Sequence, residues 1–291
     1  MPATHADTNL TYDEALELGP DGGLIAIASR PTISTHHRPG VIILNAGVLH
    51  RVGPHRLHVT LARRLAARAL PTLRLDLAGI GDSPGRGDGG TFRASAVADA
   101  RTAMTSLGAL TGAERFILIG LCAGADNSIA TGLVDDRVAG VVLVDPATYR
   151  TRAARLRKLA ERVRDAGGPV GAARWAAGVV RRRLDRSGAP VAEGGGNQGR
   201  ELPPPDEHGA QLAALADRGV AVLCVYSDAH GEKYNHPDQV FELFPALRGR
   251  VDAAFVAGSN HVFTERAAQA ALLDHVVAWI ERRFPARLPA P

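Results

Sequence analysis

The sequence contains only two cysteines among its 291 residues, Cys122 and Cys224. Two cysteines are too few for the disulfide framework of a small secreted protein, and their scarcity is typical of a reducing compartment. No segment approaches the roughly 18 consecutive apolar residues of a membrane span, and residues 1–18 lack the basic start and apolar run of a signal peptide. We therefore expect a cytoplasmic protein that does not enter a membrane.

Aromatic residues are also scarce, at 4% of the chain. Proteins that bind single-stranded nucleic acid stack the bases on aromatic side chains, so this composition argues against nucleic acid as a partner. The net charge is only +4, but residues 150–200 carry thirteen Lys or Arg against four acids. This concentration predicts a local basic surface, suited either to an acidic partner or simply to solubility.

The pattern of apolar residues predicts strands that alternate with helices. Short apolar runs predict strands at 24–29, 41–44, 72–77, 116–121, 138–144, 220–226 and 251–256, and helices are expected at 55–69, 91–108, 123–133, 238–247 and 264–283. Strands this apolar, separated by helices, predict a mostly parallel, twisted sheet that is covered by helices on both faces. The expected fold class is therefore α/β.

The alternation is interrupted between residues 147 and 215. Residues 147–166 and 170–186 are expected to form two Arg-rich amphipathic helices, and the Gly- and Pro-rich stretch 187–205 is expected to be a flexible loop. The predicted organisation is a core made of residues 1–146 and 216–291, into which residues 147–215 are inserted as a helical cap.

A sharp turn between a predicted strand and a predicted helix carries Cys122, in the sequence Gly120-Leu121-Cys122-Ala123-Gly124. A nucleophile on such a turn needs small neighbours, because the backbone passes close to the adjoining elements. The positive end of the following helix favours a thiolate, and the backbone N–H of Ala123 is one expected oxyanion donor. The second is expected from Gly47 or Val48, in the loop after an earlier strand.

Together with two further segments, this turn makes the chain resemble an α/β-hydrolase. Residues 74–83 (RLDLAGIGDS) are similar to the fourth strand and following loop of that fold. His261, in Gly258-Ser259-Asn260-His261, follows the last predicted strand, where the family keeps its catalytic histidine. The resemblance implies an α/β-hydrolase fold and a catalytic triad, with Cys122 in place of the usual serine and His261 as the base.

The acid of this triad has two candidate positions. The family usually places it just beyond the seventh strand, but here that position falls on His230 rather than on a carboxylate. Asp145 is the first choice, because the chain resembles the Dieckmann cyclases that release tetramate products from assembly lines, cysteine members of this fold with the acid after strand six. The alternative is Asp228 or Glu232, in a shifted loop.

A thiol nucleophile favours acyl transfer, because attack on a thioester gives an acyl-cysteine that stays reactive toward carbon and amine nucleophiles. We therefore expect an acyl-transfer enzyme that acts on a small-molecule thioester without metal or other cofactor, either a thioesterase or a Dieckmann-type cyclase. The expected partner is an acidic acyl carrier protein, docked on Arg155, Lys158, Arg162, Arg181 and Arg182. The alternatives are a small-ester or lactone hydrolase of the dienelactone hydrolase type and a non-catalytic pseudo-hydrolase scaffold.

Overall fold

The structure is a computed structural model, which describes residues 11–19, 23–32, 38–86, 90–168, 200, 202–230 and 234–286 and five isolated positions between 170 and 177. Its strands are β1 (Thr11–Leu18), β2 (Leu24–Pro31), β3 (Gly40–Leu44), β4 (Thr72–Leu75), β5 (Phe116–Leu121), β6 (Val138–Val144), β7 (Ala221–Ser227) and β8 (Asp252–Val256). Its α-helices are α1 (Leu57–Ala66), α2 (Phe92–Thr111), α3 (Ala123–Gly132), α4 (Arg152–Asp165), α6 (Pro205–Asp217), α7 (Gln239–Leu243) and α8 (Arg266–Arg283), with 3-10 turns at Pro54–Arg56, Asp228–His230 and Pro245–Leu247.

The strands form a single eight-stranded sheet in the order β1-β2-β4-β3-β5-β6-β7-β8. From β4 to β8 neighbouring strands are parallel, whereas β1 and β2 pair antiparallel at one edge. The central strands β5 and β6 are buried along their whole length, which explains why they are continuous apolar runs in the sequence. The predicted mostly parallel sheet is confirmed.

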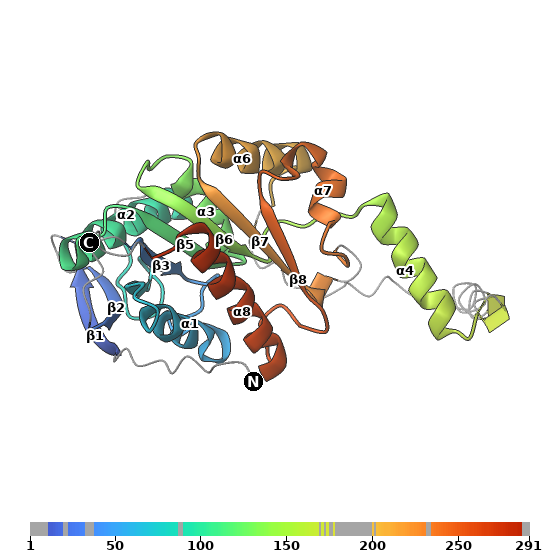
Figure 1. Ribbon diagram of the computed structural model, residues 1–291, viewed down its shortest axis with the longest axis horizontal. Coiled ribbons are helices and arrows are strands. Elements are labelled where there is room, and N and C mark those ends of the chain that lie inside the picture. The colour runs from blue at the N-terminus through green and yellow to red at the C-terminus, as the bar shows by residue number, and fades with distance from the viewer. Residues whose placement is uncertain are drawn as a thin grey trace.

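Helices cover both faces of this sheet (Figure 1). On one face, Leu61 and Leu65 of α1 share a hydrophobic cluster with Leu272 and Val276 of α8. On the other face, α2, α3 and α6 contribute to a second cluster that includes Leu212 of α6. Among the described residues, no helix combines the length and the apolar character needed to cross a bilayer.

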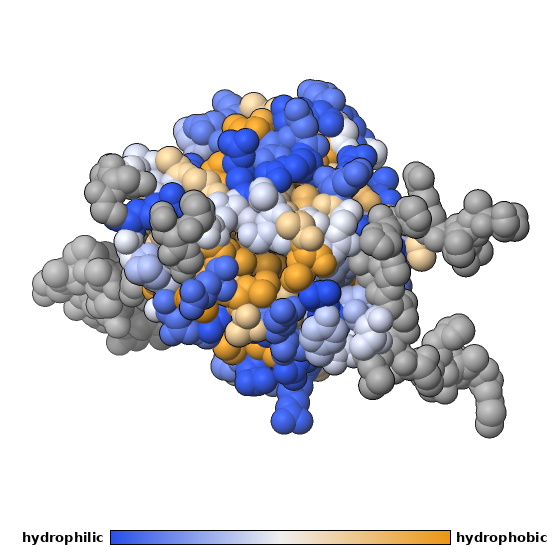
Figure 2. Space-filling model, turned by 90° about the vertical axis from the view of Figure 1, so that its left-hand side faces the viewer, coloured by the Kyte–Doolittle hydropathy of each residue, from blue (hydrophilic) through white to orange (hydrophobic). Residues whose placement is uncertain are grey.

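The edge strand β1 was not predicted from the sequence. It carries Asp13, Glu14 and Glu17 among its eight residues, and Asp13 and Glu14 form ion pairs with Arg63 and Arg30. Charged side chains on an edge strand oppose pairing with a second sheet. Figure 2, which looks at the β1 end of the molecule, shows hydrophilic residues around a central apolar patch.

Between β6 and β7 the described residues include two helices, α4 and α6. Helix α4 projects away from the sheet (Figure 1), and its Leu156 and Leu159 are 59% and 55% exposed. Helix α6 lies mostly within the range predicted for the cap, yet its Leu212 and Leu215 are fully buried in the core. Most of the predicted helix at 170–186 and most of the predicted loop at 187–205 fall outside the described residues.

Candidate active site

The candidate catalytic residues meet at one edge of the sheet, because the carboxyl ends of parallel strands lie together. Cys122 directly follows β5, Asp145 directly follows β6, and His261 lies in the connection from β8 to α8. The alternative acid Asp228 follows β7 at the same edge and is exposed, accepting a hydrogen bond from Gly258 N–H at 3.3 Å. Glu232 falls outside the described residues.

The turn that carries Cys122 has the close backbone approaches that its glycines predict. Cys122 itself has φ 58° and ψ −118°, a conformation that L-residues rarely adopt. A Cβ on Gly120 would lie 2.0 Å from the backbone of Gly124, and a Cβ on Gly124 would lie 2.6 Å from the carbonyl oxygen of Asn45. Only glycine fits at both positions, and the result is a half-buried thiol at the N-terminus of α3.

His261 is oriented by Asp145. Its Nδ1 donates to Asp145 Oδ2 at 2.8 Å, which leaves Nε2 to face the thiol. Asp145 is buried, with 1% of its surface exposed, and its carboxylate also accepts from the backbone N–H and the hydroxyl of Ser227, each at 2.6 Å. Asp145 therefore holds the histidine ring while the sheet holds Asp145.

The charges of this group favour a thiolate and an imidazolium. Burial raises the pKa of the Cys122 thiol, but a hydrogen bond with His261, the charge of Arg200 and the Ala123 N–H together outweigh it, so the net pKa is lowered. Hydrogen bonds with Asp145 and Cys122 raise the pKa of His261 to about 9. By contrast, burial raises the pKa of the Cys224 thiol to about 12, as expected for a cysteine in the hydrophobic core.

Arg200 and Asp126 are two further polar residues at this site, and the sequence analysis did not identify either. Arg200 Nη1 lies 3.4 Å from Cys122 Sγ, while its Nε and Nη2 donate to the two oxygens of Asp126 at 2.6 and 2.7 Å. The place of Asp126 in the first turn of the helix that follows Cys122 was a usable signal for Asp126. Arg200, 78 residues away in sequence, had no local signal.

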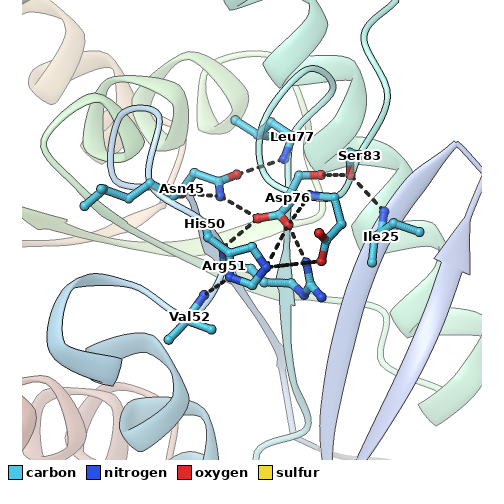
Figure 3. A network of polar contacts seen from close by, with 10 residues as sticks. Ile25, Asn45, His50, Arg51, Val52, Asp76, Leu77 and Ser83 are labelled. Atoms are coloured by element: carbon cyan, nitrogen blue, oxygen red, sulfur yellow. Dashed lines mark hydrogen bonds and ion pairs between the residues drawn. The ribbon is translucent and has the colours of Figure 1, made fainter.

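The predicted oxyanion loop, Asn45–Val48, is held by a buried polar network (Figure 3). The side-chain amide of Asn45 donates to the carbonyl oxygen of Leu49 at 2.8 Å and to Asp76 Oδ1 at 3.0 Å. Its oxygen accepts from Leu77 N–H at 2.8 Å. Asp76 is fully buried and also accepts from the backbone N–H and the guanidinium of Arg51. The loop is thereby tied to the end of β4.

The backbone amides predicted to form the oxyanion hole belong to Ala123, beside the nucleophile, and to Gly47 and Val48, in the loop that begins at Asn45. The Ala123 N–H hydrogen-bonds the Cys122 thiol. Gly47 has φ +61° and Val48 is 84% exposed, which places both at the tip of a turn closed by the Leu49 N–H and the Ala46 carbonyl. Within the described part of the chain, the amides of Gly47 and Val48 have no acceptor. They are therefore available to a bound oxygen.

One group of side chains has the composition of a metal site. Ligand atoms of His50, Asp76 and Asp82 lie within 4.8 Å of one another. The guanidinium of Arg51, however, donates to both carboxylates, at 2.7 Å in the case of Asp82. Arg51 thus supplies the positive charge that a cation would bring to these acids.

The residues predicted to dock a carrier protein lie on and beside α4. Arg155, Lys158 and Arg162 line an open groove of about 210 Å³ together with Arg150 and Leu159. Arg181 and Arg182 fall outside the described residues. The groove is basic, and Leu159 is the one apolar side chain among the residues that line it.

Comparison of the sequence with protein-family models and with curated proteins gave no match. The structure, in contrast, is similar to that of a putative α/β hydrolase of unknown function from Agrobacterium tumefaciens, with a TM-score of 0.53 and 16% identity over 95% of this chain and 100% of the other. The chain has the α/β-hydrolase fold.

Two further structures with the α/β-hydrolase fold have functional names. A thioesterase domain from the curacin biosynthetic pathway has a TM-score of 0.54 and 17% identity over 92% of this chain and 100% of the domain. A putative dienelactone hydrolase from Klebsiella pneumoniae has a TM-score of 0.55 and 14% identity over 94% of this chain and 100% of the other. At these identities the likeness establishes the α/β-hydrolase fold, and the chemistry has to be argued from the site.

Proposed function

We propose that this chain is an acyl-transfer enzyme with Cys122 as nucleophile, His261 as general base and acid, and Asp145 as the orienting acid. The observation that carries the proposal is the continuous series of contacts from Cys122 through His261 to a buried Asp145. A nucleophile in contact with a base that is in turn oriented by a third group is the arrangement that acyl transfer requires.

The first half-reaction forms an acyl-cysteine. The Cys122 thiolate attacks the carbonyl carbon of a thioester, and the oxygen that becomes negative is stabilised by the Ala123 N–H and by the amides of Gly47 and Val48. When this intermediate collapses, the bond to the substrate's sulfur breaks, and the departing thiolate takes the proton of the His261 imidazolium. The acyl group is then bound to Cys122 as a thioester.

The second half-reaction releases the acyl group. His261 removes a proton from water or from a carbon nucleophile within the acyl chain, and the activated group attacks the acyl-cysteine carbonyl. The Sγ–carbon bond then breaks, and Cys122 returns as a thiolate. Water gives an acid, as in a thioesterase, whereas an internal carbon nucleophile closes a ring, as in a Dieckmann cyclisation.

A thioester substrate suits this nucleophile better than an oxyester. Exchange of one thioester for another is nearly balanced in free energy, so Cys122 needs little help to become acylated and remains a good leaving group. The lowered pKa of the Cys122 thiol favours its ionisation, so a weaker base is enough to activate it. The fold likeness to a thioesterase domain is compatible with this substrate class, and the likeness to a dienelactone hydrolase supports lactones as the second candidate substrate.

The proposed partner is an acyl carrier protein that presents the thioester. Carrier proteins of this kind are acidic, and the groove lined by Arg155, Lys158 and Arg162 offers the complementary charge. Charge complementarity of this kind accelerates association and depends on ionic strength. Reversing two of these charges, in Arg155→Glu with Arg162→Glu, should therefore slow acylation from a carrier-bound substrate and leave acylation from a free thioester unchanged.

Intact-mass spectrometry with simple acyl-thioesters tests the proposed chemistry. We expect wild type to gain the mass of the acyl group, and Cys122→Ala to gain nothing. A parallel panel of lactones and oxyesters distinguishes the two substrate classes, because the class that acylates faster is the better substrate. A wild type that stays unmodified by both panels would contradict the enzyme proposal and favour a non-catalytic scaffold.

A Cys122→Ser variant tests the role of the thiol. An oxyester intermediate acylates carbon less readily than a thioester does, so the variant should lose ring closure more than hydrolysis. Product ratios measured by liquid chromatography on a substrate with an internal carbon nucleophile give the comparison. Full retention of ring closure by the Cys122→Ser variant would contradict the proposed role of the thiol in cyclisation.

A further inference from the structure

The contact between Arg200 and Cys122 belongs to none of the three triad residues. Arg200 Nη1 lies 3.4 Å from Cys122 Sγ, and the side chain is 12% exposed, so the contact is largely shielded from water. In the proposed reaction Sγ is the reacting atom. A guanidinium beside it therefore acts on the nucleophile directly.

Asp126 fixes the direction in which this guanidinium points. A guanidinium presents two N–H groups along one edge, on Nε and Nη2, and a further pair on Nη1. Asp126 occupies the first edge with both oxygens, at 2.6 and 2.7 Å, which leaves Nη1 to face the sulfur. Cys122 directly precedes α3 and Asp126 lies in the first turn of that helix, so Arg200 bridges two side chains at the N-terminus of α3.

We propose that Arg200 is a fourth catalytic residue of this site, which pairs with the Cys122 thiolate, and that Asp126 is the positioning residue that aims it. The catalytic role of Arg200 rests on the proposed function, whereas its ion pair with the Cys122 thiolate does not depend on any substrate. Arg200 then shares with His261 the work of holding the sulfur ionised, and it stays charged when His261 gives its proton to the leaving group.

The described chain just beyond Arg200 is attached to the protein body. The Tyr149 hydroxyl donates to the carbonyl oxygen of Pro203 at 2.6 Å, three residues beyond Arg200. The Tyr149 carbonyl oxygen in turn accepts from the Gln239 side chain at 3.0 Å. These contacts attach Pro203 to the segment that follows β6 and, through Gln239, to α7.

The electrostatics agree with this geometry. Burial lowers the pKa of Arg200, but its hydrogen bonds and charge interaction with Asp126 outweigh that effect and raise it, so the guanidinium stays protonated. An opposite charge within about 4–6 Å commonly shifts a pKa by about 1–3 units toward the charged form. Loss of Arg200 should therefore leave a thiol that ionises at higher pH.

The test is the pH dependence of Cys122 alkylation by iodoacetamide, followed by intact mass. We expect Arg200→Gln to raise the apparent pKa of alkylation by about one unit, and Arg200→Lys, which keeps the charge, to raise it less. At a pH below the thiol pKa of both wild type and Arg200→Gln, the alkylation rate of the variant should be only about threefold lower. The variant has less thiolate, but a more basic thiolate is also more nucleophilic. The matched control is Arg218→Gln, which removes the same charge from an ion pair with Asp136. Arg218 precedes β7 and Asp136 precedes β6, so this pair lies at the amino ends of the strands, away from Cys122.

An apparent pKa that is unchanged in Arg200→Gln, or that rises equally in Arg218→Gln, would overturn the inference. Circular dichroism establishes that each variant is folded, and if Arg200→Gln is not, Arg200→Lys and Arg200→Met carry the same comparison. Failure of the proposed function has a different signature: wild type would form no acyl adduct while the pKa difference persisted.

Asp126 is tested by combining substitutions. In the Arg200→Gln background, Asp126→Asn removes only a nearby negative charge and should lower the alkylation pKa of Cys122. In wild type the same change also releases the guanidinium, so the pKa should fall less or should rise. Equal shifts in the two backgrounds would show that Asp126 does not aim Arg200.

Discussion

The proposed role of Asp145 leads to the sharpest prediction, because the residue acts on a group whose pKa can be measured. In Asp145→Asn the side chain keeps its shape but loses the charge that faces His261 Nδ1 across 2.8 Å. The hydrogen bond with Asp145 is the largest cause that raises the pKa of His261 to about 9. Without it, burial of the ring opposes the charged form, and we expect the pKa of His261 to fall to about 6.5 or below.

The consequence at working pH is large. At pH 7.5 a histidine of pKa about 9 is roughly 97% protonated, whereas one of pKa about 6.5 is roughly 10% protonated. The substitution also weakens the contact that orients the ring. His261 therefore becomes a poorer proton donor to the leaving group. We expect the rate of acyl-adduct formation to fall by about 10²–10⁴-fold, the usual contribution of general acid–base catalysis.

The assay is a ring-proton NMR titration of His261, assigned through a His261→Gln variant, together with adduct kinetics on the same samples. Asp228→Asn is the matched control, since Asp228 is exposed and bonds the backbone of Gly258. An unchanged pKa of His261 in Asp145→Asn, or an equal loss of rate in Asp228→Asn, would refute the assignment of the acid. Because the pKa of folded His261 is raised, the charge-dependent part of its stabilisation should be complete below pH 6.5 and be lost as the pH rises through about 9.

Three further substitutions test the packing around the site, each by urea denaturation. Gly120→Ala places a Cβ 2.0 Å from backbone and should cost about 2–3 kcal/mol, while Gly23→Ala, with nothing within 4 Å, should change stability by less than about 0.5 kcal/mol. Asn45→Ala strands buried hydrogen-bonding groups and should cost about 2–3 kcal/mol and slow adduct formation. Leu212→Ala should cost about 2–5 kcal/mol if α6 belongs to the core, and exposed Leu159→Ala less than about 0.5 kcal/mol; equal costs would contradict that placement of α6.

The sequence predicted the interior of the fold better than its edges. The strands predicted at 116–121 and 138–144 coincide with β5 and β6, because a strand buried on both faces must be apolar at every position. Strand β1 escaped prediction since an edge strand has one free side and here carries three acids. Helix α6 was not among the predicted helices, and only the structure shows that its Leu212 and Leu215 belong to the core.

The residues of the candidate site also differ in how far the sequence could predict them. The turn at Cys122, the loop at Gly47 and the position of His261 are local features of strand ends, so sequence patterns could place them. The choice between Asp145 and Asp228 depended on the direction of side chains at neighbouring strand ends, which no pattern contains. Arg200 depended on a loop that returns to the site from 78 residues away, and nothing in its flanking sequence indicates that return.

The position of Asp145 has a consequence for how such a site can change. Its N–H bonds the carbonyl oxygen of Val225 at 2.8 Å and its carboxylate bonds Ser227, so the sheet framework fixes it without help from any loop. In the α/β-hydrolases that place their acid beyond strand seven, the connection after that strand has to keep its length and path. Here the segment that begins at Asp228 holds no group of the proposed triad. Grafting or lengthening it is therefore a route to a new substrate range in which the reacting groups stay where they are.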